Sequence, residues 1–423
     1  MTLLEIKPIP HPLQAAVCLP GSKSLTNRAL LIAALATGTT RLRGALFSDD
    51  SCYLVQALQG LGFDVRVDEA NSEMGVAGLG GKIPASRAEL FIGNAGTAAR
   101  FLSAFLTLGT GQYILDGEAR MRERPVGGLV EALRALGGQL ETVNGCPPVK
   151  IEASGLRGGK TRIAGDISSQ FLSALLMVSP YARRPVEIEV ITELNSKPYV
   201  DMTIAIMRDF GLTMEREGYS RFVIHPARYA SLPTYAIEPD ASGASYFFAA
   251  PAICGGTVRV EHISRRSLQG DLAFLDILQQ MGCPITAGDD FIEVTGGGTL
   301  SGIDADLRDM PDTAQTLAAI APFALSPTRI HGIASARLKE TDRIHATCTE
   351  LARLGVQVDE HPDGLTIYPC RKFRPAIVQT YADHRMAMAF SLIGLRLDGV
   401  TIENPDCVSK TFPNYFDVLG TLR

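Results

Sequence analysis

The stretch 19-LPGSKSLTNRALLIAALA-36 contains a turn signal, a helix start and an apolar helix in direct succession. The Pro-Gly pair predicts a turn, and Ser22 and Ser24 can each cap the apolar helix that follows. Lys23 and Arg28 then lie near the first turn, where the helix dipole disfavours cations. Because free backbone N–H groups also point outward there, the positive charge predicts a bound anion, although a solvated helix start explains this stretch equally well. The spacing of a P-loop is absent.

The composition predicts a globular chain of two to three domains. Its 423 residues are 46% hydrophobic and 20% charged, with a net charge of −5. That charge argues against binding to nucleic acid or to a membrane surface, and no apolar run reaches the roughly 18 residues of a membrane span. The eight cysteines lack metal-binding spacing, and the N-terminus does not resemble a signal peptide. We therefore expect a cytoplasmic protein with reduced thiols and no metal.

A helix that ends in an apolar residue followed by glycine recurs at intervals of 65 to 75 residues. Each such glycine predicts a left-handed helix cap, and these glycines are Gly62, Gly137, Gly211, Gly282, Gly355 and Gly420. A second set of helices is apolar nearly all round, which predicts that they are buried. These helices cover 29–36, 98–108, 171–178, 246–253, 317–325 and 386–397. Each repeat thus contains a buried helix, a strand, an amphipathic helix and further strands.

The six repeats predict an α/β protein with two cores of three repeats each. They are too long for a solenoid, whose units usually span about 20 to 45 residues. The last repeat is cut short at the C-terminus, and an N-terminal strand over 3–9 can complete it, while a second crossing is expected at 235–240. We therefore expect one domain of residues 1–19 plus 238–423 and another of residues 20–237. Two strands would join them, and the active site would lie in the cleft between them.

Polar or charged clusters stand just ahead of these helices. They are 93-GNAGT-97, 120-RMRERP-125, 168-SSQ-170, 196-SKPY-199, 311-PDT-313, 337-RLKETDR-343, 383-DHR-385 and 409-SKTFP-413. Asn94, Thr97 and Asp312 can cap helices, and the three arginines at 120–124 predict an anion-binding claw. The hydroxyls and amide at 168–170 suit a phosphate or a polyol. Helix capping or a solvated charged loop explains each cluster equally well when it is taken alone.

The joint placement of these clusters is the stronger indication. In a repeat, helix starts fall on equivalent sides of each core, so two facing cores would bring their cations to one cleft. Those cations are Lys23, Arg28, Arg124, Lys339, Arg343, Arg385 and Lys410. Two carboxylates stand out among them, Asp312 and Glu340. The pattern predicts a site for one or two polyanionic small molecules with one acid and one base, and no metal set, Ser-His-Asp order or dinucleotide fingerprint competes.

These residues together resemble the motifs of the 3-phosphoshikimate 1-carboxyvinyltransferase (5-enolpyruvylshikimate-3-phosphate synthase) family. The matching stretches run in the family's order over nearly the whole chain: 20-PGSKS-24, 27-NRA-29, 93-GNAGTA-98, 122-RERP-125, 168-SSQFL-172, 339-KETDR-343, 383-DHRMA-387 and 410-KTFP-413. The resemblance implies the enolpyruvyl transferase fold of two domains, each built of three βαβαββ units. It also implies transfer of the enolpyruvyl group of phosphoenolpyruvate to the 5-hydroxyl of shikimate 3-phosphate, with loss of phosphate through a tetrahedral intermediate, on the shikimate pathway to the aromatic amino acids.

The resemblance further implies a cytoplasmic, mostly monomeric enzyme without metal or organic cofactor. Asp312 would take the hydroxyl proton, Glu340 would handle the proton at the phosphoenolpyruvate methylene, and Lys23 would assist at the departing phosphate. The implied phosphoenolpyruvate ligands are Lys23, Gly96, Arg124, Arg343, Arg385 and Lys410. The implied shikimate 3-phosphate ligands are Ser24, Arg28, Ser168, Ser169, Gln170, Ser196, Tyr199 and Lys339. Asn94, Asp312 and His384 complete the expected substrate-binding set.

Three positions depart from the family pattern. Ser335 stands where the family usually has Asn, and Ala99 and Phe101 stand where Met and Pro are frequent. The last two lie behind the pocket that glyphosate occupies in the family. Gly96 is the residue of the glyphosate-sensitive type, so the resemblance leaves the sensitivity of this protein to glyphosate open.

Two other functions are alternatives. UDP-N-acetylglucosamine 1-carboxyvinyltransferases share the fold but carry a Cys ahead of an Arg-Pro pair, and residues 116–124 contain none. A non-catalytic binder of phosphorylated metabolites would gain nothing from Asp312 and Glu340.

Overall fold

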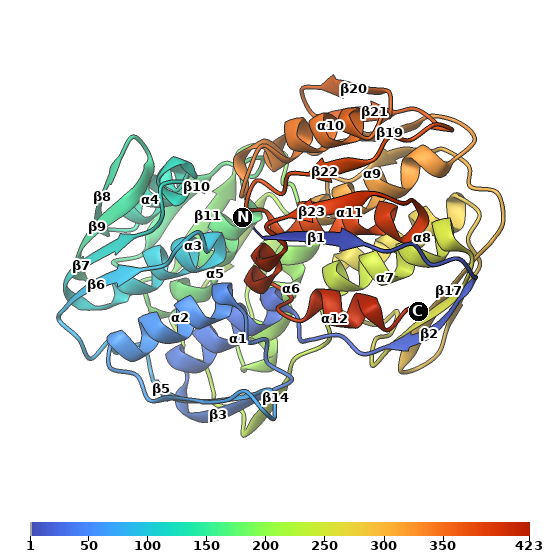
Figure 1. Cartoon of the computed structure of the whole chain (residues 1–423). Coiled ribbons are helices and arrows are strands. Elements are labelled where there is room, and N and C mark those ends of the chain that lie inside the picture. The colour runs from blue at the N-terminus through green and yellow to red at the C-terminus, as the bar shows by residue number, and fades with distance from the viewer. Residues whose placement is uncertain (1) are drawn as a thin grey trace. The chain divides into compact units, whose positions relative to one another are not determined.

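The computed structural model describes residues 2–423, and these form two compact units (Figure 1). Unit 1 contains the described residues up to Pro20 and those from Glu238 to Arg423, and unit 2 runs from Gly21 to Ile237. Each unit has a hydrophobic core drawn from its own residues alone. No helix within residues 2–423 has the length and apolar character needed to cross a membrane.

Six helices form the centres of the two cores. In unit 2 they are α1 (Lys23–Leu35), α3 (Gly96–Phe105) and α5 (Ser169–Val178), and in unit 1 they are α7 (Ala241–Cys254), α9 (Ala314–Ile320) and α11 (His384–Arg396). Nearly all of their residues are buried, because each helix is apolar around its whole circumference. The structure confirms the six buried helices expected from the sequence, and each begins two to six residues before its apolar run.

Unit 2 contains three four-stranded sheets. Their strands, in spatial order, are β14 (Thr234–Ala236), β3 (Thr37–Arg43), β5 (Glu73–Leu79) and β4 (Val65–Asp68); β6 (Arg87–Phe91), β7 (Thr110–Asp116), β9 (Cys146–Ser154) and β8 (Gln139–Val143); and β10 (Gly159–Ile163), β11 (Val186–Val190), β13 (Arg221–Ile224) and β12 (Glu215–Glu217). In each sheet the first two strands are parallel, and the remaining neighbours are antiparallel. A buried helix joins the parallel strands β6 and β7, and another joins β10 and β11.

Unit 1 repeats this plan with one shortened sheet. Its strands, in spatial order, are β16 (Ile285–Ala287), β17 (Phe291–Gly296), β15 (Gly256–Glu261) and β2 (Leu13–Val17); β18 (Asp304–Asp306), β19 (Thr328–His331), β21 (Gly364–Ile367) and β20 (Val358–His361); and β1 (Leu3–Ile6), β23 (Val400–Glu403) and β22 (Ala376–Val378). Figure 1 shows β1, in blue, beside β23, in red, with which it pairs antiparallel. This pairing confirms that an N-terminal strand completes the last repeat.

The remaining helices are amphipathic and cover the cores. They are α2 (Asp49–Gly60), α4 (Gly127–Ala135), α6 (Lys197–Asp209), α8 (Phe274–Gln280), α10 (Arg343–Arg353) and α12 (Tyr415–Gly420). Five of the six predicted cap glycines have positive φ. The prediction is wrong for Gly420, because that residue is itself the last residue of α12 and Thr421 caps the helix in a right-handed conformation.

Short 3₁₀ helices complete the fold: η1 (Leu106–Leu108), η2 (Met121–Glu123), η3 (Ser179–Tyr181), η4 (Gly270–Ala273), η5 (Pro311–Thr313), η6 (Ala321–Phe323), η7 (Ala334–Leu338) and η8 (Pro405–Lys410).

Candidate active site

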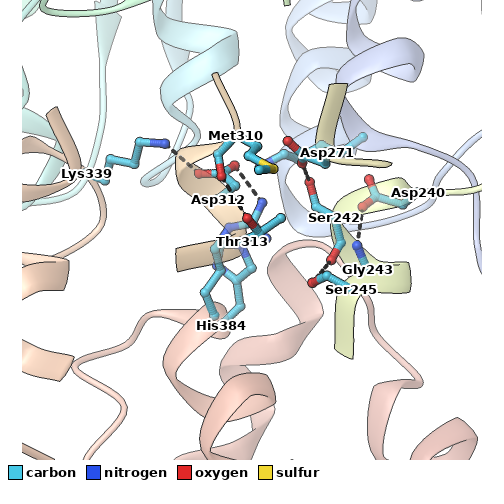
Figure 2. Close-up of polar contacts among 12 residues, drawn as sticks. Asp240, Ser242, Gly243, Ser245, Asp271, Met310, Asp312, Thr313, Lys339 and His384 are labelled. Carbon is cyan, nitrogen blue, oxygen red and sulfur yellow. Dashed lines mark hydrogen bonds and ion pairs between the residues drawn. The ribbon is translucent and has the colours of Figure 1, made fainter. Parts of the chain in front are cut away.

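Helix starts in unit 1 gather a dense ionic cluster around Asp312. Its carboxylate accepts hydrogen bonds from Lys339 Nζ at 2.5 Å, from Arg343 Nη1 at 3.0 Å and from Arg385 Nη2 at 2.6 Å. Figure 2 shows the Lys339 ammonium directed at this carboxylate. The three cations come from separate segments: the residues after η7, the first residue of α10 and the first turn of α11. The structure thus brings three of the seven expected cations onto one carboxylate within this unit.

Asp312 does not cap a helix, contrary to the alternative that the sequence left open. It lies within η5, and α9 begins at Ala314 without a side-chain cap. Asp383 does cap α11, because its carboxylate accepts a hydrogen bond from Arg385 N at 2.9 Å. Asp312 is therefore available for ionic contacts, whereas Asp383 both caps α11 and binds a cation.

Arg343 is the centre of this cluster. Its Nε donates to Asp383 Oδ2 at 2.7 Å, and its Nη2 donates to Glu340 Oε2 at 2.7 Å, in addition to the bond with Asp312. The side chain is only 3% exposed, so burial alone would disfavour its charge. The three carboxylates compensate for that cost, and the local charge is nearly balanced before any ligand binds. His384 and Lys410, on α11 and η8, are also buried.

The same neighbours shift the pKa values of this cluster. Burial opposes ionisation of Asp312, but Arg385, Lys339 and Arg343 outweigh it and hold the pKa of Asp312 well below its usual range. Burial lowers the pKa of Lys339, and although Asp312 opposes that shift, the two arginines add to it. Burial would lower the pKa of Arg343 as well, but its carboxylate partners raise it above the usual value. At neutral pH Asp312 is therefore a fixed anion.

The start of α7 differs from the starts of α9 and α11. Asp240 caps it by accepting a hydrogen bond from Gly243 N at 2.6 Å, and Ser242 donates to the buried carboxylate of Asp271 (Figure 2). The side chains at this start are hydroxyls and carboxylates, so the cations of unit 1 gather at the other two buried helices.

In unit 2, several of the predicted site residues lie at the start of α1. Ser22 caps the helix, with Leu25 N donating to its Oγ at 3.4 Å, whereas Ser24 lies inside the first turn. Lys23, the first helical residue, places its Nζ 3.2 Å from Asp50 Oδ2, and Asp50 is buried. Asp50 is not among the residues predicted from the sequence. The run 48-SDDS-51 at the start of α2 was the available signal, because it combines a helix cap with two carboxylates.

Arg28 is held entirely by protein groups. Its Nε donates to Thr203 Oγ1 at 2.7 Å, and its Nη atoms donate to the carbonyl of Ser24 at 3.0 Å and to that of Tyr199 at 3.3 Å. Its guanidinium carbon lies 5.3 Å from the ring centroid of Phe101. Burial lowers the pKa of Arg28 to about 10, although Tyr199 opposes that shift. At 1% exposure this residue supports the core of the site, and its contact with a substrate stays a prediction.

Arg124 reaches the loop before α3. Its Nη1 donates to the carbonyl of Asn94 at 2.8 Å and to Asn94 Oδ1 at 2.9 Å. The expected caps at Asn94 and Thr97 are wrong, because α3 has Ala95 at its N-cap without a side-chain cap. Asn94 binds Arg124 instead, and Thr97 Oγ1 accepts a hydrogen bond from Gln170 Nε2 at 3.1 Å.

The predicted claw of three arginines is not formed. Arg120 pairs with Glu123 at 2.7 Å, and Arg122 pairs with Asp116 at 2.6 Å. Each of these two arginines thus has a carboxylate partner close to it in the chain. Arg124 instead reaches the loop at Gly96, where Arg100 Nη1 also donates to the Gly96 carbonyl at 3.0 Å.

The starts of α5 and α6 supply the remaining polar groups of unit 2. Ser168 caps α5 by accepting a hydrogen bond from Gln170 N at 3.3 Å, and Ser169 is buried beside it. Ser196 precedes α6 with a left-handed φ of 57°, which a non-glycine residue seldom adopts. Tyr199 follows in the first turn of α6, with its ring centroid 5.9 Å from the guanidinium carbon of Arg28. Unit 2 therefore holds hydroxyls and amides together with three of the expected cations, Lys23, Arg28 and Arg124, whereas the two candidate carboxylates, Asp312 and Glu340, belong to unit 1.

Comparison with known proteins places the chain in one family. The family described as EPSP synthase (3-phosphoshikimate 1-carboxyvinyltransferase) matches residues 8–419. The 3-phosphoshikimate 1-carboxyvinyltransferase of Sulfurovum sp. (strain NBC37-1) is 49% identical over 426 residues, which cover 100% of this chain and 99% of the relative. The protein of the same name from Nostoc punctiforme is 49% identical over 418 residues, covering 98% of each.

A solved structure agrees with these relatives. The EPSP synthase from Acinetobacter baumannii superposes with a TM-score of 0.82 at 27% identity, covering 99% of this chain and 97% of that one. The similarity confirms the predicted α/β enolpyruvyl transferase fold, and the sequence relatives confirm the predicted resemblance. The chain therefore belongs to the EPSP synthase (3-phosphoshikimate 1-carboxyvinyltransferase) family.

Proposed function

We propose that this chain transfers the enolpyruvyl group of phosphoenolpyruvate to the 5-hydroxyl of shikimate 3-phosphate and releases phosphate. The observation that carries the proposal is the Asp312 cluster, in which two carboxylates of different surroundings lie among three cations. Asp312 contacts all three cations, and Glu340 accepts a hydrogen bond from Arg343. Such a pair separates the two proton transfers that addition and elimination require.

The chemistry assigns a step to each carboxylate. Glu340 protonates the methylene carbon of phosphoenolpyruvate while Asp312 takes the proton of the attacking 5-hydroxyl, which forms the tetrahedral adduct. The C–O bond to phosphate then breaks, the proton taken from the 5-hydroxyl passes to the departing phosphate so that Asp312 is again ionised, and the methyl group returns a proton to Glu340 as the enol ether forms. Lys23 neutralises the oxygen that leaves with phosphate. The cations stabilise the negative charge that develops on the adduct.

Substrate binding prepares Asp312 for its step. Its three cationic partners hold its pKa well below the usual range, which makes it a weak base in the free protein. Phosphoenolpyruvate and shikimate 3-phosphate are anions, and both would draw on the charge of these partners. Because the substrate anions then offset part of the positive charge around Asp312, its pKa rises toward the ordinary range and it becomes a stronger base.

The proposal divides the remaining residues between the two substrates. Phosphoenolpyruvate is bound by Lys23, Gly96, Arg124, Arg343, Arg385 and Lys410, and shikimate 3-phosphate by Ser24, Arg28, Ser168, Ser169, Gln170, Ser196, Tyr199 and Lys339, with Asn94 and His384 beside them. Because these residues come from both units, the proposal requires the units to close on the substrates. Solution scattering should show a smaller radius of gyration with both ligands than without, and an unchanged radius would contradict closure.

Phosphate release from phosphoenolpyruvate, measured with each acceptor in turn, tests the proposed reaction. We expect turnover with shikimate 3-phosphate and none with UDP-N-acetylglucosamine, and the reverse result would overturn the proposal. Binding of both ligands without any release of phosphate would favour the non-catalytic alternative. Arg124→Ala should raise the KM for phosphoenolpyruvate, and an unchanged affinity would remove Arg124 from the site.

The two carboxylates give a second test. Asp312→Asn and Glu340→Gln keep the shape of each side chain but remove its proton chemistry, so we expect kcat to fall by at least about 10²-fold. Asp304→Asn is the matched control, since Asp304 lies on β18 of the same unit and is exposed. Binding of shikimate 3-phosphate, followed by calorimetry, should survive in Glu340→Gln. Full turnover in either variant would contradict the role assigned to that carboxylate.

We further propose that the chain works as a monomer in the cytoplasm, as the family resemblance implies. Light scattering of the purified protein and fractionation of cells that express it test the two statements. A stable dimer, or recovery with the membrane fraction, would contradict them.

A further inference from the structure

The segment 379–383, just ahead of α11, makes a turn that non-glycine residues seldom form. Tyr381 and Ala382 are both left-handed, with φ of 54° and 53°. Two consecutive side chains in this conformation persist only when the surrounding structure holds them. The turn ends at Asp383, which caps α11 and binds Arg343 Nε at 2.7 Å. The conformation of this turn therefore decides where the residues that follow it enter the ionic cluster.

Glu350 on α10 stabilises this turn through two hydrogen bonds. Its Oε1 accepts a hydrogen bond from Tyr381 O–H at 2.7 Å, and its Oε2 accepts one from the backbone N–H of Gln379 at 3.0 Å. The carboxylate is fully buried, at 0% exposure. Arg353 Nε lies farther away, 3.6 Å from Oε1. Because a buried carboxylate costs free energy unless it is well bonded, its two short bonds to the turn account for its place there.

Helix α10 thus binds the segment at both ends. Arg343 and Glu350 are seven residues apart, a spacing that puts two side chains on the same face of a helix. Arg343 holds Asp383 at the end of the segment, and Glu350 holds Gln379 and Tyr381 at its beginning. Within the segment, Asp383 N donates to the Thr380 carbonyl at 2.8 Å. One helix, α10, therefore binds this turn and also provides Arg343 to the ionic cluster.

We propose that Glu350 and Tyr381 are positioning residues for the transfer reaction. By holding the left-handed turn they set Asp383, and through the start of α11 they set Arg385, whose Nη2 lies 2.6 Å from Asp312. The inference rests on the proposed function, in which Arg343 and Arg385 bind phosphoenolpyruvate. Loss of the Tyr381–Glu350 bond therefore displaces phosphoenolpyruvate ligands and leaves most shikimate 3-phosphate ligands, which belong to unit 2, untouched.

Tyr381→Phe tests the inference with the removal of one O–H group. We expect the KM for phosphoenolpyruvate to rise about 10-fold, while the dissociation constant of shikimate 3-phosphate in the binary complex changes less than twofold. The matched control is Tyr368→Phe, which removes a tyrosine hydroxyl that donates to Asp359 Oδ2 at 2.8 Å on the surface of the same unit. The control should leave both constants unchanged.

Glu350→Gln provides an independent variant, because the amide retains one acceptor oxygen but presents an N–H₂ group to the other donor. We expect the same rise in the KM for phosphoenolpyruvate. Adding Tyr381→Phe to Glu350→Gln should raise it by less than the sum of the two separate effects, since both changes release the same turn. If Glu350→Gln does not fold, Tyr381→Phe alone decides the question.

The outcomes separate the two hypotheses. Absence of turnover with shikimate 3-phosphate in the unmodified protein would refute the proposed function itself. An active protein in which Tyr381→Phe behaves like Tyr368→Phe would overturn the positioning role. A lower melting temperature with an unchanged KM for phosphoenolpyruvate would overturn it too, because it would show that the bond is merely structural.

Discussion

Asp312 shows how neighbouring side chains, rather than the residue type, set the chemistry of a group. The same carboxylate could have capped α9, but three cations from distant segments bind it. Its charge in turn offsets the free-energy cost of burying Arg343 and of partly burying Lys339, so each member of the cluster stabilises the others. We infer that substrates enter by competing for these ion pairs, which couples binding to the basicity of Asp312.

The stability of the protein should report the low pKa of Asp312. A carboxylate whose folded-state pKa lies below the unfolded value of about 3.9 stabilises the fold above that pH, and the contribution is lost as the pH falls toward the folded-state pKa. We expect Asp312→Asn to lower the free energy of unfolding by roughly 2 kcal/mol at pH 7. The difference from the unmodified protein should shrink below about pH 4. Urea unfolding at a series of pH values measures it, and a difference that stayed constant down to pH 2 would contradict the ionic account.

Gly96 leaves room for two guanidinium groups. A Cβ on this residue would lie 2.4 Å from Arg124 Nη2 and 2.6 Å from Arg100 Nη1, so both side chains would have to move. Because flexible side-chain ends move at little cost, Gly96→Ala should change the melting temperature only slightly and raise the KM for phosphoenolpyruvate severalfold. Gly128→Ala is the control, since its nearest neighbour would be at an ordinary 3.7 Å. An unchanged KM would show that the position of Arg124 does not matter for binding.

At the scale of elements, the candidate site residues lie at the N-termini of helices, whereas the C-termini carry the residues that turn the chain into the next strand. The starts of α10 and α11 each place an arginine where the helix dipole is unfavourable, and a capping carboxylate, Asp342 or Asp383, lies next to it. Five of the six outer helices, all but α12, instead end at a glycine of positive φ that leads toward the next strand. This division lets one repeated unit vary its site residues without changing its core.

The glycine caps predict a contrast between two substitutions. Gly211 has a φ of +83° and its nearest neighbour would be 3.6 Å from an added Cβ, so Gly211→Ala is strained by backbone conformation alone and should cost about 1 kcal/mol. Gly420 is helical with open space around it, so Gly420→Ala should be neutral or stabilise by up to about 1 kcal/mol. Chemical denaturation measures both. Equal effects would contradict the difference in backbone conformation.

At the scale of the whole molecule, the chain forms two separate cores, and the residues of unit 2 lie between the two stretches of sequence that form unit 1. The core of unit 2 uses no residue from unit 1, and its first sheet is completed by β14 at the end of the unit. Unit 1 is built from both ends of the chain, because β1 and β2 pair with β23 and β15. Each unit therefore holds only part of the proposed site.

Residues 21–237 should consequently fold alone. We expect the isolated segment to unfold cooperatively, because its core and its three sheets are complete, and to release no phosphate from phosphoenolpyruvate, because Asp312 and Glu340 are absent. Circular dichroism during thermal unfolding and a phosphate assay check the two statements. A segment that unfolds without a cooperative transition would show that unit 2 depends on unit 1 for its stability.

Sequence alone determined the helices, the repeats and the family of this protein, because apolar periodicity, caps and motifs are local properties of the chain. It also identified the two carboxylates and the basic residues as candidates. It failed at Asn94, Thr97 and Gly420, where a cap was expected from residue type, and at the arginine claw, where Asp116 and Glu123 each took one arginine.

Only the tertiary structure decided the partners. The pair of Lys23 with Asp50, the three cations on Asp312 and the hold of Glu350 on Tyr381 join residues 27 to 73 positions apart, at distances set by how strands and helices pack. Local rules say what a side chain can do, whereas the fold determines which groups lie within reach of it. The charge balance of the site therefore follows from packing, not from composition.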